Sequence, residues 1–169
     1  MILVTVGNMD PFDRLIMAVD NWLKNESIDE RVIMQIGDGE YLPSQCEYVR
    51  RLSPCDYTRY FEQSRLVISH AGMGTIITAL ELGKPIVVMP KKSALGEQRN
   101  DHQLATVRRF HRSRLINVAE SEEELPGLLK KWSSESFLNS ENSKIEKTEW
   151  KPDEPLIEFV RGFICKCVK

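Results

Sequence analysis

The stretch LVISHAGMGT, residues 66–75, joins a short apolar run to a pair of glycines. The apolar run predicts a strand buried on both faces, which is the kind of strand that parallel sheets contain. The glycines predict a tight turn into a helix that continues to about Leu82, where Gly83 and Pro85 end it. A buried strand that passes through a glycine turn into a helix is the repeating unit of an α/β fold.

The same alternation extends in both directions from this turn. Short apolar, β-branched runs predict further strands at residues 2–6, 31–36, 48–52, 85–90 and 115–118. Helical spacing of apolar residues predicts helices at residues 10–23, 56–63, 102–110 and 122–132. The first of these helices is expected to begin at Asp10-Pro11, with the carboxylate as its N-cap. We therefore predict a Rossmann-like parallel sheet with helices on both faces.

One domain is expected to hold the sheet, because 169 residues with 41% hydrophobic content are enough for a single core. Residues 1–132 would form this domain. Residues 133–155 are polar and lack periodicity, so they are interpreted as a loop or linker. Residues 156–169 predict a C-terminal helix, which packs either on the domain or on a membrane-anchored partner.

Composition and charge exclude several classes of protein. The net charge of -2 offers no basic surface, so we predict no nucleic-acid partner. No apolar run reaches the roughly 18 residues that cross a bilayer, and no basic leader precedes the first strand. We therefore expect a cytoplasmic chain. The cysteines form no CxxC pair, which predicts reduced thiols and no metal site; they are Cys46, Cys55, Cys165 and Cys167.

The glycine turn is the candidate ligand site. Gly72 and Gly74 would let a ligand approach the backbone, and the following helix N-terminus presents free N–H groups to a diphosphate. Thr75 would add a hydroxyl donor, with His70 just before the turn. A tight turn that needs glycine for geometry alone is the alternative interpretation. The third glycine of a dinucleotide fingerprint would fall at Ile77, and no Walker lysine follows, which disfavours NAD and ATP.

Three separated motifs then point to one family. They are VTVG (residues 4–7) followed by PFDRL (residues 11–15), the glycine turn, and NDHQLA (residues 100–105). In this order and spacing, residues 1–130 resemble the family-28 C-terminal domain of GT-B glycosyltransferases. They are similar to the short Alg13-type subunits and the bacterial PssE-type exopolysaccharide subunits. The resemblance implies inverting transfer from a UDP-sugar, in polysaccharide or lipid-linked glycan synthesis.

The resemblance also implies a role for each matching residue. The donor diphosphate would be bound by His70, Gly72, Met73, Gly74 and Thr75. The ribose or sugar would contact Thr78, Asn100, Asp101 and Gln103. Leu52 and Ser53 would lie near the uracil, and Gly7 and Asn8 would face the acceptor. Many GT-B enzymes carry a ribose-binding glutamate where this chain has Thr78, and a neutral hydroxyl is a weaker partner than a carboxylate.

No residue of this chain is predicted to be the catalytic base. His70 is assigned to the phosphate, where it and the helix end would neutralise the departing UDP without a metal or other cofactor. His102 is interpreted as close to the sugar or on the helix surface, and His111 as solvated. The base and the acceptor site are therefore expected from a membrane-anchored Alg14- or PssD-like partner that binds a lipid-linked saccharide acceptor. That partner would hold the chain at the membrane periphery.

Two other functions remain open at the level of the sequence. One is a non-catalytic subunit that binds a nucleotide-sugar and regulates a partner enzyme, which the absence of a base and Thr78 both allow. The other is a nucleotide-binding module outside glycosyl transfer, such as a flavodoxin-like protein. The three motifs in one order favour glycosyl transfer over this last class.

Overall fold

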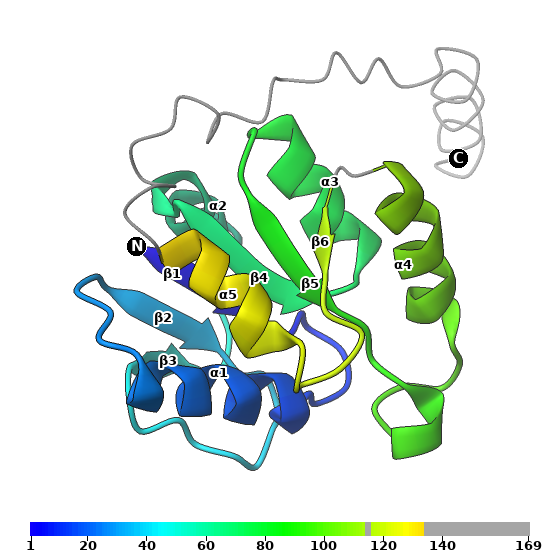
Figure 1. Cartoon of the computed structure of the whole chain (residues 1–169), viewed down its shortest axis with the longest axis horizontal. Coiled ribbons are helices and arrows are strands. Elements are labelled where there is room, and N and C mark those ends of the chain that lie inside the picture. Colours follow the sequence, from blue (N-terminus) through cyan, green and yellow to red (C-terminus); the bar gives the residue numbers. More distant parts are fainter. Residues whose placement is uncertain (114–115, 134–169) are drawn as a thin grey trace, which may run out of the picture.

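The predicted architecture, a parallel sheet between two layers of helices, is the one observed (Figure 1). The computed structural model describes residues 1–113 and 116–133. The predicted C-terminal helix and all of the predicted linker except Ser133 lie outside these residues. Among the described helices, none is both long and apolar enough to cross a membrane.

In the described part of the chain, six strands form the sheet in the order β3-β2-β1-β4-β5-β6, and every neighbouring pair is parallel. The strands are β1 (Ile2–Thr5), β2 (Val32–Gln35), β3 (Glu47–Val49), β4 (Leu66–His70), β5 (Ile86–Met89) and β6 (Asn117–Val118). The helices are α1 (Asp13–Asn25), α2 (Pro54–Gln63), α3 (Met73–Glu81), α4 (His102–Ser113) and α5 (Leu125–Ser133), with a short 3-10 turn η1 (Ser93–Leu95).

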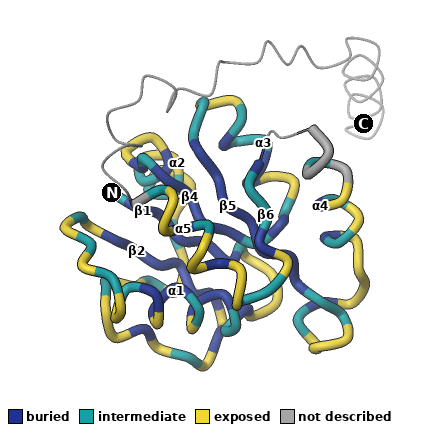
Figure 2. The backbone as a smooth tube through the Cα atoms, viewed as in Figure 1, coloured by how far each residue is buried: buried dark blue, intermediate teal, exposed yellow. Residues whose placement is uncertain are grey.

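Each face of the sheet has its own core. Val4 and Ile68 point to one face, where α1 and α5 cover them, while Leu3 and Val67 point to the other face, under α2, α3 and α4. The central strands are therefore buried along their length, except at His70, the last residue of β4 (Figure 2). This double burial explains why these strands are continuous apolar runs rather than alternating patterns.

Some predicted boundaries are wrong by a few residues. Helix α1 begins at Asp13 rather than at Asp10-Pro11, and its N-cap Phe12 makes no capping side-chain hydrogen bond. Strand β3 ends at Val49 instead of continuing to Leu52. Helix α2 begins two residues early, at Pro54, because the hydroxyl of Ser53 accepts a hydrogen bond from the backbone N–H of Asp56. Helix α5 begins at Leu125, three residues late.

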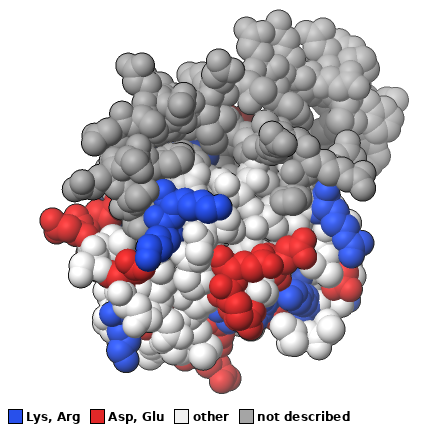
Figure 3. Space-filling model, viewed as in Figure 1, with Lys and Arg blue, Asp and Glu red and all other residues white. Residues whose placement is uncertain are grey.

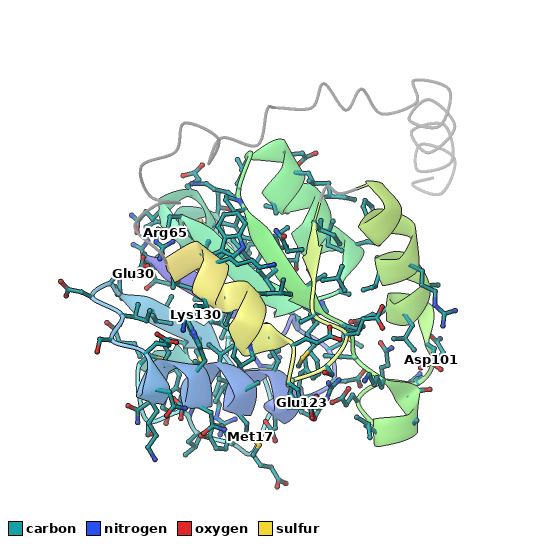
Figure 4. The ribbon with its side chains drawn as sticks, viewed as in Figure 1. Met17, Glu30, Arg65, Asp101, Glu123 and Lys130 are labelled. Atoms are coloured by element: carbon teal, nitrogen blue, oxygen red, sulfur yellow. The ribbon has the colours of Figure 1, made fainter. Side chains whose placement is uncertain are left out.

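Ion pairs fix the amino-terminal end of the sheet. The carboxylate of Glu30 accepts from the guanidinium of Arg65, and the two side chains lie side by side in Figure 4. Glu30 also pairs with the terminal amine of Met1 at 2.9 Å. These contacts join the starts of β1, β2 and β4, which leaves the opposite, carboxyl-terminal edge of the sheet for a ligand.

The strand order reverses between β1 and β4. After β1 the chain builds outward through β2 and β3, and from β4 it builds in the other direction through β5 and β6. The connections after β1 and β4 therefore run to opposite faces of the sheet and leave a crevice at its carboxyl-terminal edge. Open α/β sheets bind their ligands at such a crevice.

Candidate functional site

A cleft of about 470 Å³ lies at this reversal point. It is lined by the last residues of β1, β2 and β4, by the loops that follow β1 and β3, and by α2 and α3. The lining residues are Thr5, Gly7, Asn8, Gln35, Leu52, Pro54, Tyr57, His70, Gly74, Thr75 and Thr78. Seven of the residues singled out in the sequence thus meet around one space, although they come from segments up to 71 positions apart.

The N-terminus of α3 contributes backbone N–H groups to this cleft. Gly72 is the N-cap of α3, and no side chain caps the helix. A Cβ built on Gly74 would meet no atom within 4 Å, so the backbone there faces open space. Uncapped N–H groups at a helix N-terminus carry a partial positive charge, which makes them suitable donors to an anion.

His70 lies tightly against two glycines. A Cβ on Gly72 would stand 2.1 Å from Nε2 of the imidazole, and one on Gly7 would stand 2.7 Å from its Cε1. Both glycines are therefore required by the ring itself. Burial, together with the nearby charge of Lys91, lowers the pKa of His70 to about 4.

The imidazole of His70 is consequently neutral at pH 7. Burial disfavours the charged form of His70, so the predicted neutralisation of the departing UDP by this residue depends on what a bound diphosphate does to its pKa. A neutral ring can still donate one hydrogen bond to a phosphate oxygen. The remaining positive potential must come from α3 and from other side chains.

Hydrogen bonds join Thr5 and Gln35 at the floor of the cleft to each other and to neighbouring backbone carbonyls. The hydroxyl of Thr5 donates to Oε1 of Gln35 over 2.6 Å. Nε2 of Gln35 donates to the carbonyls of Gly7 (2.9 Å) and Arg50 (3.2 Å). Sequence reasoning missed both residues, although a signal was present: each is a polar residue at the carboxyl end of an otherwise apolar strand.

Helix α2 forms one side of the cleft. Its Tyr57 hydroxyl donates to Oγ1 of Thr75 over 3.4 Å, which joins α2 to the first turn of α3. Leu52 and Pro54 also line the cleft here, so the predicted uracil region has an apolar and aromatic surface. Ser53, the other residue predicted there, caps α2 and does not line the cleft.

Thr78 and Met73, two further residues predicted to contact the donor, are less available to it than predicted. Thr78 lines the cleft, but its hydroxyl donates to the carbonyl of Gly74 over 2.9 Å, within the same helix. A ribose would have to compete with this bond. The Met73 side chain is 45% exposed and lies outside the cleft lining, so Met73 can contribute only its backbone.

The structure does not bring Asn100, Asp101 or Gln103 to the cleft lining. Asn100 accepts from the backbone N–H of His102 at the start of α4, and the exposed carboxylate of Asp101 accepts from Ser93. Figure 4 shows Asp101 beside the start of α4. Both residues help to build the η1–α4 corner, and their contact with the sugar stays a prediction.

Gln103 is an internal brace. Its side chain is 5% exposed, and its Oε1 accepts from the backbone N–H groups of Ala71 and Lys91, both at 3.1 Å. Ala71 belongs to the turn after β4, and Lys91 follows β5. Gln103 thus holds two loops of the carboxyl edge in register, and its contact with the sugar stays a prediction.

Some charged side chains outside the cleft form ion pairs within the fold. Arg14 pairs with Glu97 at 2.7 Å and with Glu122 at 2.8 Å, and acidic and basic side chains adjoin on the face shown in Figure 3. Within residues 1–113 and 116–133, no group of three or more His, Cys, Asp or Glu side chains could hold a metal ion. Cys46 and Cys55 are free thiols, and burial raises the pKa of Cys46 to about 12.

A doubly wound parallel sheet with a glycine-lined cleft at its reversal point defines a Rossmann-like ligand-binding domain. Within that class, the model of the "Glycosyltransferase family 28 C-terminal domain" matches residues 1–153, and the chain belongs to this family.

The chain is also similar in sequence to curated proteins. The chain is 35% identical over 122 residues to the human protein "UDP-N-acetylglucosamine transferase subunit ALG13", which covers 66% of this chain and 10% of that protein. It is 33% identical over 134 residues to the protein of the same name from Yarrowia lipolytica, covering 70% of this chain and 64% of that protein. The chain thus spans only a tenth of its human relative and less than two thirds of the yeast one.

Solved structures share the fold. The crystal structure of Acinetobacter baumannii MurG superposes with a TM-score of 0.59 at 18% identity, over 79% of this chain and 41% of that one. The NMR structure of ALG13 superposes with a TM-score of 0.53 at 20% identity, over 79% and 85% of the two chains. These likenesses confirm the predicted GT-B type of Rossmann-like fold.

Proposed function

We propose that this chain is the donor-binding subunit of an inverting, UDP-sugar-dependent glycosyltransferase. The observation that carries the proposal is the meeting of the uncapped α3 N-terminus, the open backbone at Gly74 and the imidazole of His70 in one cleft. Membership of the family-28 group supports it. The names of the curated relatives make UDP-N-acetylglucosamine the first donor to test.

The diphosphate is assigned to the α3 N-terminus, where backbone N–H groups of Gly74 and Thr75 would donate to its oxygens. The same donors would stabilise the charge that develops on the departing UDP, because they are fixed before the reaction begins. The uracil is assigned to the surface made by Leu52, Pro54 and Tyr57. No metal or other cofactor enters this scheme.

The catalytic base is assigned to a partner chain. Inverting transfer needs a base that accepts the proton of the acceptor hydroxyl, and an effective base at pH 7 has a pKa near 7. Among the described residues, His70 is the only histidine that lines the cleft, and its pKa of about 4 is too low for that task. The curated relatives are named as subunits, which also supports a partner.

We assign to that partner a membrane-anchored, Alg14- or PssD-like character and the binding of a lipid-linked saccharide acceptor. The chain would then work at the cytoplasmic periphery of a membrane through its partner. Transfer of a radiolabelled sugar to lipid-linked acceptor by the co-expressed pair, and by neither chain alone, is the expected result. Transfer by this chain alone would contradict the assignment of the base.

A second candidate function is a regulatory subunit that binds a nucleotide-sugar without taking part in transfer. It is favoured by Thr78, whose hydroxyl is already used within α3. One variant distinguishes the two functions. Loss of donor binding through Gly74→Asp would abolish transfer by the pair if this chain holds the donor, and would leave basal transfer if it only regulates.

The first experiment is a calorimetric titration of the full chain with UDP and UDP-N-acetylglucosamine, with ADP and NAD as comparison ligands. We expect binding of the uridine nucleotides alone, and its loss in Gly74→Asp, which places a carboxylate in the anion site. Gly127→Asp is the matched control, because Gly127 in α5 also faces open space but lies outside the cleft. UDP binding by neither the chain nor the co-purified pair would refute the proposal.

A further inference from the structure

Lys91 is a buried lysine behind the cleft. It follows β5, its side chain is 2% exposed, and its Nζ donates to the backbone carbonyls of Asp10 (2.6 Å) and Met9 (3.3 Å). These carbonyls belong to the loop after β1, which also contains Gly7 and Asn8 of the cleft lining. The ammonium therefore holds the outer part of one cleft wall.

The ammonium has no paired carboxylate. Within the part of the chain that the structure describes, no Asp or Glu oxygen lies within 4.0 Å of Nζ, whereas Arg14 nearby pairs with two glutamates. Burial lowers the pKa of Lys91, and the more distant carboxylates of Asp10 and Glu97 oppose this shift. The Phe12 ring, whose centroid lies 5.6 Å from Nζ, is its aromatic neighbour. An unpaired buried cation costs desolvation free energy, and neutral carbonyls offset only part of that cost. The charge at this position is therefore kept at a cost in free energy.

The backbone of Lys91 is fixed as well. Its N–H donates to Oε1 of Gln103, which also accepts from Ala71, and its carbonyl accepts from Nε2 of Gln98 over 2.8 Å. The loops after β1, β4 and β5 are thereby tied together through one residue. The charge is close enough to His70 to lower the pKa of that imidazole, so its field reaches the cleft.

We propose that Lys91 is a positioning residue of the donor site, which fixes the loop that carries Gly7 and Asn8 and supplies a buried positive charge to the diphosphate. The inference rests on the proposed function. The α3 N-terminus offers only about half an elementary charge, and His70 is neutral, so these two groups fall short of balancing a diphosphate. A buried ammonium that is held in place by hydrogen bonds supplies the missing positive charge, since it needs no reorganisation when the ligand binds.

The test compares charge-free variants with a matched surface control. Lys91→Met and Lys91→Gln remove the charge, Lys91→Arg keeps it, and Lys24→Met removes an exposed lysine from α1. Dissociation constants of UDP and of uridine, which lacks phosphate, are measured by NMR titration of the full chain. We expect the charge-free variants to weaken UDP by about tenfold, which corresponds to about 1.4 kcal/mol, and to change uridine by less than about twofold.

A purely structural role of Lys91 would weaken UDP and uridine alike, so the difference between the effects on the two ligands tests the role of its charge. Lys91→Arg is expected to retain most of the UDP affinity, and Lys24→Met all of it. Equal weakening of UDP and uridine would show that Lys91 only shapes the wall, and unchanged UDP affinity would show that its charge is not used. Either result overturns the inference and leaves the proposed function standing. A wild-type chain and pair that bind no UDP would overturn both.

A second measurement needs no ligand. The ring protons of His70 are titrated by NMR in wild type and in whichever charge-free variant folds. Removal of the Lys91 charge is expected to raise the pKa of His70, because that charge now lowers it. An unchanged titration would show that the ammonium does not act on the cleft and would overturn the inference independently of UDP.

Discussion

At the scale of single residues, two glycines of one turn are predicted to respond in opposite ways to alanine. Gly72→Ala places a methyl group 2.1 Å from Nε2 of His70, so we expect a loss of roughly 1–3 kcal/mol in the free energy of unfolding. Gly74→Ala meets no atom within 4 Å and lies in a helix, so we expect a gain of roughly 0.5–1 kcal/mol. Denaturant unfolding measures both.

The same two variants distinguish effects on stability from effects on UDP binding. The methyl group of Gly74→Ala would stand where the diphosphate is proposed to approach the backbone, so UDP affinity is expected to fall although stability rises. A destabilised Gly74→Ala would show that the open space at Gly74 is filled in the folded chain. An unaffected Gly72→Ala would contradict the packing of His70 against the turn.

His70 makes the stability of the chain depend on pH in a defined window. Between pH 6.5 and about 4 the unfolded imidazole binds a proton that the folded one does not. Stability therefore falls as the pH falls through this window, by about 3 kcal/mol in total, and His70 contributes no pH dependence above it. Denaturant unfolding of wild type and His70→Asn at pH 7, 6, 5 and 4.5 measures this effect.

The slope, rather than the absolute stability, is the informative quantity, because His70→Asn also changes packing. The variant is expected to lose less stability than wild type between pH 6.5 and 4.5. Hydrogen-bonded carboxylates such as Asp20 have lowered pKa values, so their own contribution is lost mainly below this range. Parallel slopes in the two proteins would exclude a buried neutral imidazole at this position.

At the scale of elements, Gln103 is predicted to connect two loops rather than bind a sugar. Gln103→Leu leaves the N–H groups of Ala71 and Lys91 without their acceptor, so we expect a loss of about 2–4 kcal/mol in the free energy of unfolding. Asn100→Ala is the matched comparison, since it removes only an exposed cap of α4 and is expected to cost about 1 kcal/mol. Thermal and denaturant unfolding of the two variants measure this difference.

The same comparison decides between the two roles considered for Gln103. A sugar contact would make Gln103→Leu as stable as wild type, with weaker binding of UDP-N-acetylglucosamine than of UDP. A brace would lower stability and weaken both ligands alike. Calorimetric titration with the two ligands, next to the unfolding curves, therefore identifies the role without an assay of transfer.

The strands of this fold were predictable because parallel sheets bury both faces, which leaves continuous apolar runs in the sequence. The start of α1 was not, although Asp10-Pro11 has the composition of a helix cap. The carbonyl of Asp10 instead accepts from Lys91, which lies 81 residues further along the chain. A tertiary hydrogen bond of this range overrides a local preference and leaves no local trace.

At the scale of the whole molecule, the predicted part of the site depends on local sequence, and the missed part depends on contacts between distant residues. Gly72, Gly74 and His70 belong to one turn, so a local motif was enough to bring them together. Gln103 was recognised as part of a motif, but its role depends on Ala71, which is 32 residues away. Thr5 and Gln35 form the floor only because β1 and β2 pair side by side.

The position of the cleft leads to a last prediction. One wall comes from the half of the sheet that contains β1 to β3, including Gly7 and Asn8, and the other comes from the half that begins at β4, including Gly74 and Thr75. A ligand that bridges the reversal point must stabilise the loops of both halves, since it binds the folded state alone. We expect UDP to slow amide hydrogen exchange in residues 7–10 and 72–76 together.

Exchange in residues 94–97 serves as the internal control, because Gly96 faces open space and this segment lies outside the cleft lining. Mass spectrometry of peptides with and without saturating UDP follows all three segments in one experiment. Protection confined to residues 72–76 would place the nucleotide on α3 alone. The loop that Lys91 holds would then not be part of the donor site. Protection of both segments requires a ligand that spans the two halves of the sheet, which is the geometry that the reversal of strand order provides.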